Sequence, residues 1–157
     1  MSAPHVLRIG VVRAATDATG PQPTAEASRA RYAAGVKITR AGDAPDGPFE
    51  AETFSGAVSR RDYGTIEDPE GTVLLVRFPA GVRTHWHSHP NGQVLFVTEG
   101  SGRVGTRDGT VERIGPGDVV VAPANEEHWH GAAEDAGVQH LALNFGVTSW
   151  IEPVDGD

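Results

Sequence analysis

Short runs of β-favouring residues, each stopped by glycine or proline, constrain this chain more than any other feature. The clearest runs span residues 74–78, 94–98, 119–122 and 138–147. Glycine and proline are frequent, at 20 and 11 of 157 residues, and Asp108-Gly109 between two alternating runs is a strong hairpin signal. Many short strands at close spacing, without helical periodicity, predict an all-β sandwich or barrel.

The first 35 residues differ from the rest of the chain. Residues 17–24 form a Gly/Pro/Thr-rich loop, and Thr24 could cap a short helix that ends near Gly35. We therefore divide the chain into an N-terminal extension, residues 1–35, with a loop and an edge strand or short helix, and a barrel, residues 36–157. The extension is expected to contact a partner subunit or to be disordered.

Charge and composition exclude several classes of function. The formal net charge is −8, which argues against nucleic acid and against an anionic membrane surface as partners. No stretch is long and apolar enough to span a bilayer, and residues 6–12 make a poor signal peptide, so a cytoplasmic protein that acts on a small molecule is expected. Because there is no cysteine, any metal must be held by histidine, carboxylate or amide groups.

Six of the seven histidines fall in the second half of the chain, in patterns that suit strands. In a strand, the alternation of side chains places His85, His87 and His89 on one face, and it likewise pairs His128 with His130 around Trp129. His140 follows on the last long run. One such pair could simply belong to a polar barrel face. Two clusters, each bounded by Gly/Pro turns, instead predict a site for one divalent transition metal. Imidazole is a ligand for Mn, Fe, Co, Ni, Cu and Zn.

Two segments of the sequence resemble the two motifs of the cupin superfamily. In the first, Gly81, His87, His89 and Gly100 have the family's spacing, and Gln93 stands where glutamate is usual. In the second, Gly117, Pro123 and His128 match, while Asn125 replaces a glycine and Ala132 an asparagine. The first of these two replacements is mild because asparagine tolerates left-handed backbone. The resemblance implies a double-stranded β-helix, or jelly roll, with a metal inside the barrel.

Residues 36–155 are most similar to the cupin-type hydroxynitrile lyases, which cleave or form cyanohydrins such as mandelonitrile at a manganese-type site. The blocks that carry this resemblance are His-Trp-His-Ser-His-Pro-Asn-Gly-Gln, Glu-His-Trp-His-Gly-Ala-Ala and Ser-Trp-Ile-Glu. It implies His130 and His140 as catalytic residues and a homodimer or homotetramer as the assembly. It implies four metal ligands: His87, His89, Gln93 and His128.

Glutamine in place of glutamate changes the charge of such a site. A divalent ion with three imidazoles and Gln93 keeps its full charge of about +2, which favours bound anions and makes oxygen activation less natural. His130 can act as a general base for a hydroxyl proton or can orient a ligand by hydrogen bonding. His85 is a departure from the lyases. It narrows the pocket mouth, offers a different base, or lies at the rim in solvent.

Three classes of function remain open on these residues. The first is a metal-dependent carbon–carbon lyase of cyanohydrins or a related aldol-type substrate. The second is an oxygen-dependent dioxygenase, and the third is a non-enzymatic metal- or ligand-binding protein. We expect an apolar pocket for a small aromatic or alkyl group, with both tryptophans of the histidine clusters packed on the outer face. The predicted pocket residues are Leu74, Val76, Leu95 and Val97.

Overall fold

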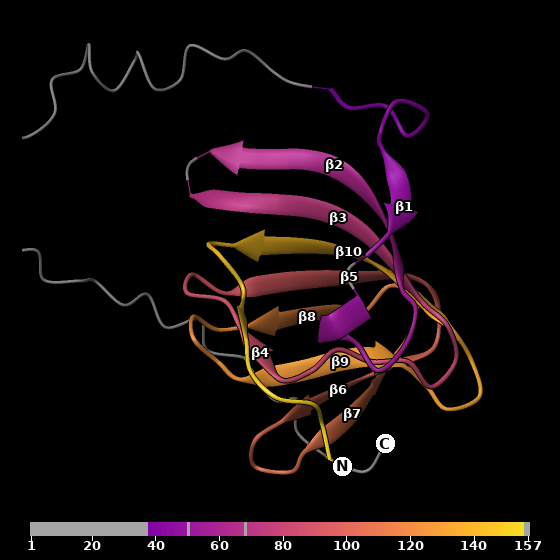
Figure 1. Ribbon diagram of the computed structural model, residues 1–157, viewed down its shortest axis with the longest axis vertical. Coiled ribbons are helices and arrows are strands. Elements are labelled where there is room, and N and C mark those ends of the chain that lie inside the picture. Colours follow the sequence, from indigo (N-terminus) through magenta and orange to yellow (C-terminus); the bar gives the residue numbers. More distant parts are fainter. Residues whose placement is uncertain (1–37, 50, 68, 156–157) are drawn as a thin grey trace, which may run out of the picture. The chain divides into compact units, whose positions relative to one another are not determined.

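The computed structural model describes residues 38–49, 51–67 and 69–155, and they fold as two antiparallel β-sheets (Figure 1). The first sheet has the order β1-β2-β3-β10-β5-β8 and the second the order β11-β4-β9-β6-β7. The first consists of β1 (Asp46–Pro48), β2 (Ser59–Glu67), β3 (Glu70–Phe78), β10 (Val138–Phe145), β5 (Gln93–Gly100) and β8 (Val119–Ala122). The second consists of β11 (Ser149–Trp150), β4 (His87–Ser88), β9 (His128–Ala132), β6 (Gly102–Thr106) and β7 (Val111–Ile114).

The predicted all-β jelly roll is confirmed. The helical content of the described residues is one 3-10 turn, η1 (Ala51–Thr53), and none of their helices is long and apolar enough to cross a membrane. The predictions for residues 1–35, including a helix capped by Thr24, lie outside the described residues.

The turn signals of the sequence act as expected. Gly109 has a φ of 87°, and the Thr110 amide donates to the Asp108 carboxylate at 2.9 Å, which closes the hairpin between β6 and β7. Asn125, which replaces the motif glycine, has a φ of 62°. This is the left-handed conformation that glycine or asparagine adopts most readily.

The core lies between the two sheets and is built by strand alternation. Leu74, Val76 and Phe78 point inward from β3 and are buried, as are Leu95 and Val97 from β5. Each large apolar side chain buried in this way contributes roughly 1.5–3 kcal/mol. The polar residues of the site interrupt this core, so the apolar part provides the stability that positions them.

Two cross-strand rows carry polar side chains into the barrel from opposite sheets. In the first sheet, Asn144 of β10 pairs with Thr72 of β3 and with Gln93 of β5. In the second sheet, His87 of β4 pairs with Trp150 of β11 and with His128 of β9. The site therefore spans both sheets, and it depends on their packing against each other.

The predicted single face for His85, His87 and His89 does not hold for all three residues. β4 contains only His87 and Ser88, so strict alternation does not extend back to residue 85. The amide of His85 donates to the Thr53 carbonyl, and its side chain does not line the main pocket. Of the three alternatives for His85, the structure favours the rim over the pocket mouth and over a base in the pocket.

Candidate metal and catalytic site

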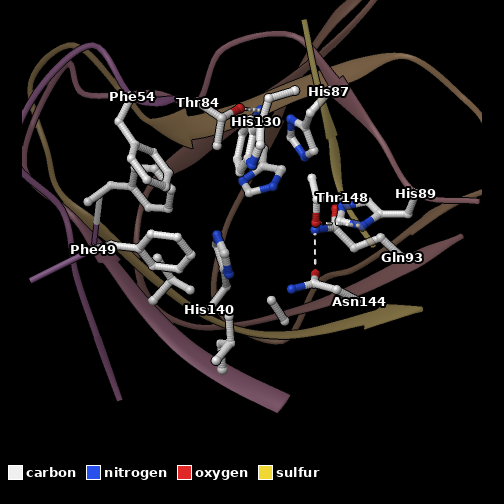
Figure 2. A pocket seen from close by; sticks show the side chains of 15 residues that line it. Phe49, Phe54, Thr84, His87, His89, Gln93, His130, His140, Asn144 and Thr148 are labelled. Carbon is white, nitrogen blue, oxygen red and sulfur yellow. Dashed lines mark hydrogen bonds between the residues drawn. The ribbon is translucent and has the colours of Figure 1, made fainter. Parts of the chain in front are cut away.

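The cavity between the sheets is lined by three groups of side chains (Figure 2). Figure 2 shows His87, His89 and Gln93 on one side and Phe49 and Phe54 on the other. The rings of His130 and His140 lie between them. The cavity volume is about 40 Å³, which is room for about three water molecules. A small ligand fits this space directly.

His87 and His128 are held in the same way by their own strands. The Nδ1–H group of His87 donates to the carbonyl oxygen of His85 at 3.0 Å, and that of His128 donates to the carbonyl of Glu126 at 2.9 Å. A carbonyl can only accept, so Nδ1 carries the proton in both rings. The Nε2 atom of each neutral ring then has a free lone pair, as a metal ligand requires.

Gln93 presents its oxygen to the same point. Its amide nitrogen donates to Asn144 Oδ1 at 2.8 Å, and the amide of Asn144 donates in turn to Thr72 Oγ1 at 3.1 Å. This chain of hydrogen bonds turns Gln93 Oε1 toward His128 Nε2, 2.9 Å away.

The approach of Gln93 to His128 brings two acceptors together. With its proton on Nδ1, neutral His128 has only a lone pair on Nε2, and the Gln93 oxygen also has only lone pairs. Two such atoms, each about 2.1 Å from one ion and at right angles, are about 3 Å apart. The 2.9 Å separation therefore fits a shared divalent ion, and the donor set suits a transition metal.

Two different sets of histidines could bind the same ion as Gln93 and His128. One nitrogen from each of His87, His128 and His130 lies within 4.8 Å of the others, which is close enough for one ion. His89 lies beside them, with its ring centroid 5.2 Å from that of His87. Its Nδ1 is hydrogen-bonded with Thr148 Oγ1 at 3.3 Å, and its buried Nε2 has no partner. His89 thus resembles the anchored rings, although the compact group contains His130.

His130 and His140 lack any anchor on their rings. Both are buried, and neither ring nitrogen of either residue has a hydrogen-bond partner in another of the described residues. Their ring centroids are 5.0 Å apart, and Phe78 packs against both rings. Only the backbone of His130 is fixed locally, where its amide donates to Thr84 Oγ1 at 3.1 Å. These two rings are free to exchange protons with a ligand.

The four histidines that line the pocket, and His128 beside them, are kept neutral by their surroundings. Burial, followed by the charge of His128, lowers the pKa of His87 to about 3, and the same two causes lower that of His89 to about 4. Burial lowers the pKa of His140 to about 4, lowers that of His128, and holds that of His130 well below its ordinary value. Among the described residues that line this pocket, none carries a carboxylate, so the groups that they offer a metal ion are neutral.

An aromatic group closes the other side of the cavity. Phe54 contacts Phe49, Phe78 and Trp150 edge to face, with centroid separations of 5.0 to 5.8 Å. Trp150 also lies over the ring of His87, at 4.9 Å. Together with Leu74 and Val76, these rings make the cavity apolar opposite the histidines.

The pocket confirms part of the lining predicted from sequence. Leu74 and Val76 line it, but the prediction for Leu95 and Val97 was wrong. Those two residues are fully buried in the core, because successive inward residues of β5 reach different depths and only Gln93 reaches the site. Trp129 is covered on the outer face by Arg83 and Arg103, and Arg107 covers Trp86.

The comparisons with known proteins agree with this architecture. A family model described as "Cupin domain" matches residues 74–143. A protein named (R)-mandelonitrile lyase, from Granulicella tundricola, is 40% identical over 124 residues, which are 76% of this chain and 95% of that protein.

Solved structures resemble the same part of the chain. A cupin-like protein from Thermotoga maritima is 35% identical, with a TM-score of 0.63 over 76% of this chain and 91% of that one. An RmlC-like cupin protein from Ralstonia eutropha is 19% identical, with a TM-score of 0.65 over 78% and 76%. At that identity, the second likeness shows the fold alone.

Proposed function

Because this chain belongs to the cupin family, we propose that it is a metal-dependent lyase that cleaves and forms cyanohydrins. The observation that carries the proposal is a pocket whose described lining has no carboxylate, in which two unanchored imidazoles lie beside a group of anchored side chains that could hold a metal. The relative named mandelonitrile lyase supports the same chemistry. A related aldol-type substrate would use the same arrangement.

The proposed metal ligands share one property. In each side chain, one nitrogen or oxygen atom is left to bind the metal while a hydrogen bond to another atom holds the side chain in place. Hydrogen bonds at Nδ1 hold His87 and His128, the contact with Thr148 holds His89, and Asn144 holds Gln93. Manganese is the proposed ion, and Fe, Zn, Ni, Co and Cu suit the same donors. The proposed ligand set is His87, His89, Gln93 and His128.

The ion would supply a Lewis acid of undiminished charge, because all four ligands are neutral. The remaining work falls to the free imidazoles. His130 would accept the hydroxyl proton of the cyanohydrin at a ring nitrogen, and the carbon–carbon bond breaks with its electron pair leaving on cyanide. The same proton, shared with His140 at a centroid separation of 5.0 Å, then passes to cyanide, and the products are a carbonyl compound and hydrogen cyanide.

The apolar side of the pocket would receive the organic group of the substrate. Phe54 and Phe78 lie next to the two free imidazoles, so an alkyl or aryl group placed there brings its hydroxyl toward His130. Because the cavity is small, an alkyl cyanohydrin should enter more easily than an aryl one, for which the aromatic side chains must move.

The test is an anaerobic assay with manganese-loaded and metal-stripped protein. Mandelonitrile and the smaller acetone cyanohydrin are supplied separately, and release of the carbonyl compound and of cyanide is measured. We expect release that depends on the metal and not on oxygen. Product formation only in air would favour the dioxygenase alternative. Metal binding without turnover of either substrate would favour a metal- or ligand-binding protein.

A further inference from the structure

One exposed side chain, that of Arg107, bridges three separate segments of the chain beside the second sheet. Arg107 directly follows β6, in the turn that leads to β7. Its Nε–H group donates to Glu127 Oε2 at 2.7 Å, and its Nη1 lies 2.6 Å from Glu152 Oε1. Its guanidinium carbon lies 4.0 Å from the centroid of the Trp86 ring. A single guanidinium group therefore contacts the residues just before β9, just before β4 and just after β11.

Two of these contacts fall within the anchors of the proposed metal ligands. Glu127 stands between His128 and the residue whose carbonyl accepts the hydrogen bond from the His128 ring. Trp86 has the same place in the anchor of His87. Because Arg107 contacts the middle residue of both three-residue stretches, it sets the spacing of the two anchored rings from outside the barrel.

The third contact holds the segment that covers one of these rings. Trp150 lies over the His87 ring at a centroid separation of 4.9 Å. Two residues further along, the Glu152 carbonyl accepts a hydrogen bond from the Trp86 amide at 2.9 Å. The side chain of Glu152 then pairs with Arg107, so the segment after β11 is bound both to the backbone of Trp86 and to the cation above the ring of Trp86.

The backbone pairing of the second sheet connects these segments unequally. β4 is two residues long, and among the described residues its pairing with β9 consists of the single pair His87 and His128. In contrast, β6 pairs with β9 through five residue pairs, and the last of them involves Thr106, the residue before Arg107. β6 and β9 are thus well connected, and Arg107 extends from them toward the short strand β4, which lies next to β9 (Figure 1).

We propose that Arg107 is a positioning residue of the metal site. An isolated exposed ion pair contributes little to stability, but a planar guanidinium with two carboxylates and a ring around it constrains direction as well as distance. Metal affinity responds to groups that only orient the ligands. Arg107 has this role only if His87 and His128 bind the ion, so the role rests on the proposed metal site and not on the lyase reaction.

The test measures manganese affinity by isothermal titration of the full-length protein. Arg107→Met removes both ion pairs and keeps an unbranched side chain over Trp86. Arg61→Met is the matched control, because Arg61 is also partly exposed and lies 2.6 Å from a carboxylate, that of Asp46, but belongs to β2, which carries no proposed ligand. We expect Arg107→Met to bind manganese about tenfold more weakly and Arg61→Met to bind it like the wild type. Arg107→Lys should lie between them, because lysine keeps the charge but not the planar fork.

A second measurement separates positioning from a loss of stability. Electron paramagnetic resonance of bound manganese reports the arrangement of its ligands, and the spectrum should change in Arg107→Met but not in Arg61→Met. Thermal unfolding of the metal-free proteins should show similar, small decreases for both variants, because each loses exposed ion pairs. Circular dichroism shows whether each variant is folded, and Glu152→Gln, which removes one of the two ion pairs, replaces Arg107→Met if that variant does not fold.

Unchanged manganese affinity in the folded Arg107 variants would overturn the proposal, and so would an equal loss of affinity in Arg61→Met. A wild type that binds neither manganese nor another divalent transition metal would overturn the proposed metal site, and the role of Arg107 with it. The two failures are therefore distinguished by the titration of the wild type.

Discussion

Two kinds of histidine share one cavity and differ in a single respect. His87 and His128 each donate Nδ1–H to a backbone carbonyl of another residue, whereas His130 and His140 have no such partner at either ring nitrogen in the part of the chain that the structure describes. Burial lowers the pKa of all four, so it does not distinguish them. The hydrogen bond at Nδ1 distinguishes the two kinds, because it fixes the tautomer of the ring and the direction of the lone pair on Nε2.

The anchors come from the strands themselves. In both cases the accepting carbonyl belongs to the residue two positions earlier, His85 for His87 and Glu126 for His128. The same short stretch of backbone thus supplies the ring and its acceptor. An anchored imidazole is suited to act as a metal ligand, which must not move. An imidazole without an anchor is suited to act as a general base, which must gain and lose a proton.

Removing an anchored ring should have the largest effect. We expect His128→Ala to lower metal affinity by about a hundredfold or more, since four ligands share roughly 10–16 kcal/mol in protein metal sites. Turnover should fall to that of metal-stripped protein. His85→Ala is the matched control, because alanine keeps the carbonyl that anchors His87. Isothermal titration with manganese measures both variants, and equal losses in the two would contradict the distinction.

Removing a free ring should affect turnover and leave the metal in place. His130→Ala is expected to lower kcat by about 10²–10⁴-fold, the usual contribution of a general base. Kinetics with acetone cyanohydrin at saturating manganese provide the measurement. A variant that keeps wild-type kcat would show that His130 only orients its neighbours.

The chain of hydrogen bonds behind Gln93 should matter less. Asn144→Leu keeps the branched arrangement of the side chain but removes the acceptor of the Gln93 amide, so Gln93 Oε1 loses its direction. We expect metal affinity to fall about 10–100-fold, as for other groups that orient a ligand. Thr72 is one hydrogen bond further from Gln93 than Asn144 is, so Thr72→Val should lower metal affinity by less. The reverse order in titrations of the two variants would argue against this chain.

Exchanging Gln93 for glutamate tests the charge of the site. Gln93→Glu adds a carboxylate to a pocket whose described lining residues have none, so manganese should bind more tightly and a small anion more weakly. Azide binding to the manganese-loaded protein, followed by electron paramagnetic resonance, compares the two forms. Equal azide affinity in both would mean that residue 93 does not contact the ion.

Acid should destabilise the metal-free protein. The pKa is about 3 for His87 and about 4 for His89 and His140 in the folded state, against 6.5 when unfolded. Between pH 6.5 and 4 the unfolded chain binds more protons, so stability falls with falling pH, by up to about 1.4 kcal/mol per pH unit for each ring. Thermal unfolding across this range checks the sign, and a melting temperature that rises on acidification would refute it.

The sequence predicted the polar half of the site better than its apolar half. His87, His89, Gln93, His128 and His130 lie in local motifs, where the spacing along a strand decides which side chains point inward. Those motifs, with His140, predicted every histidine that lines the cavity. Among the histidines of these motifs, the prediction failed for His85, because β4 is too short for alternation to extend to it.

The aromatic side could not be read from spacing. Phe49 and Phe54 flank a 3-10 turn, and Trp150 reaches the cavity only because β11 pairs with β4. Such contacts depend on which strands become neighbours, which no local pattern encodes. Asn144 lies on the same strand as His140, but its bond to Gln93 follows from the pairing of β10 with β5.

The most direct test of the account is the manganese-to-protein ratio of two single variants, measured by elemental analysis after reconstitution and gel filtration. His130 belongs to the compact group with His87 and His128, whereas His89 has the anchored geometry. The account predicts that His130→Ala retains one ion per chain and that His89→Ala loses it. Retention by His89→Ala together with loss by His130→Ala would contradict the account and make His130 a ligand.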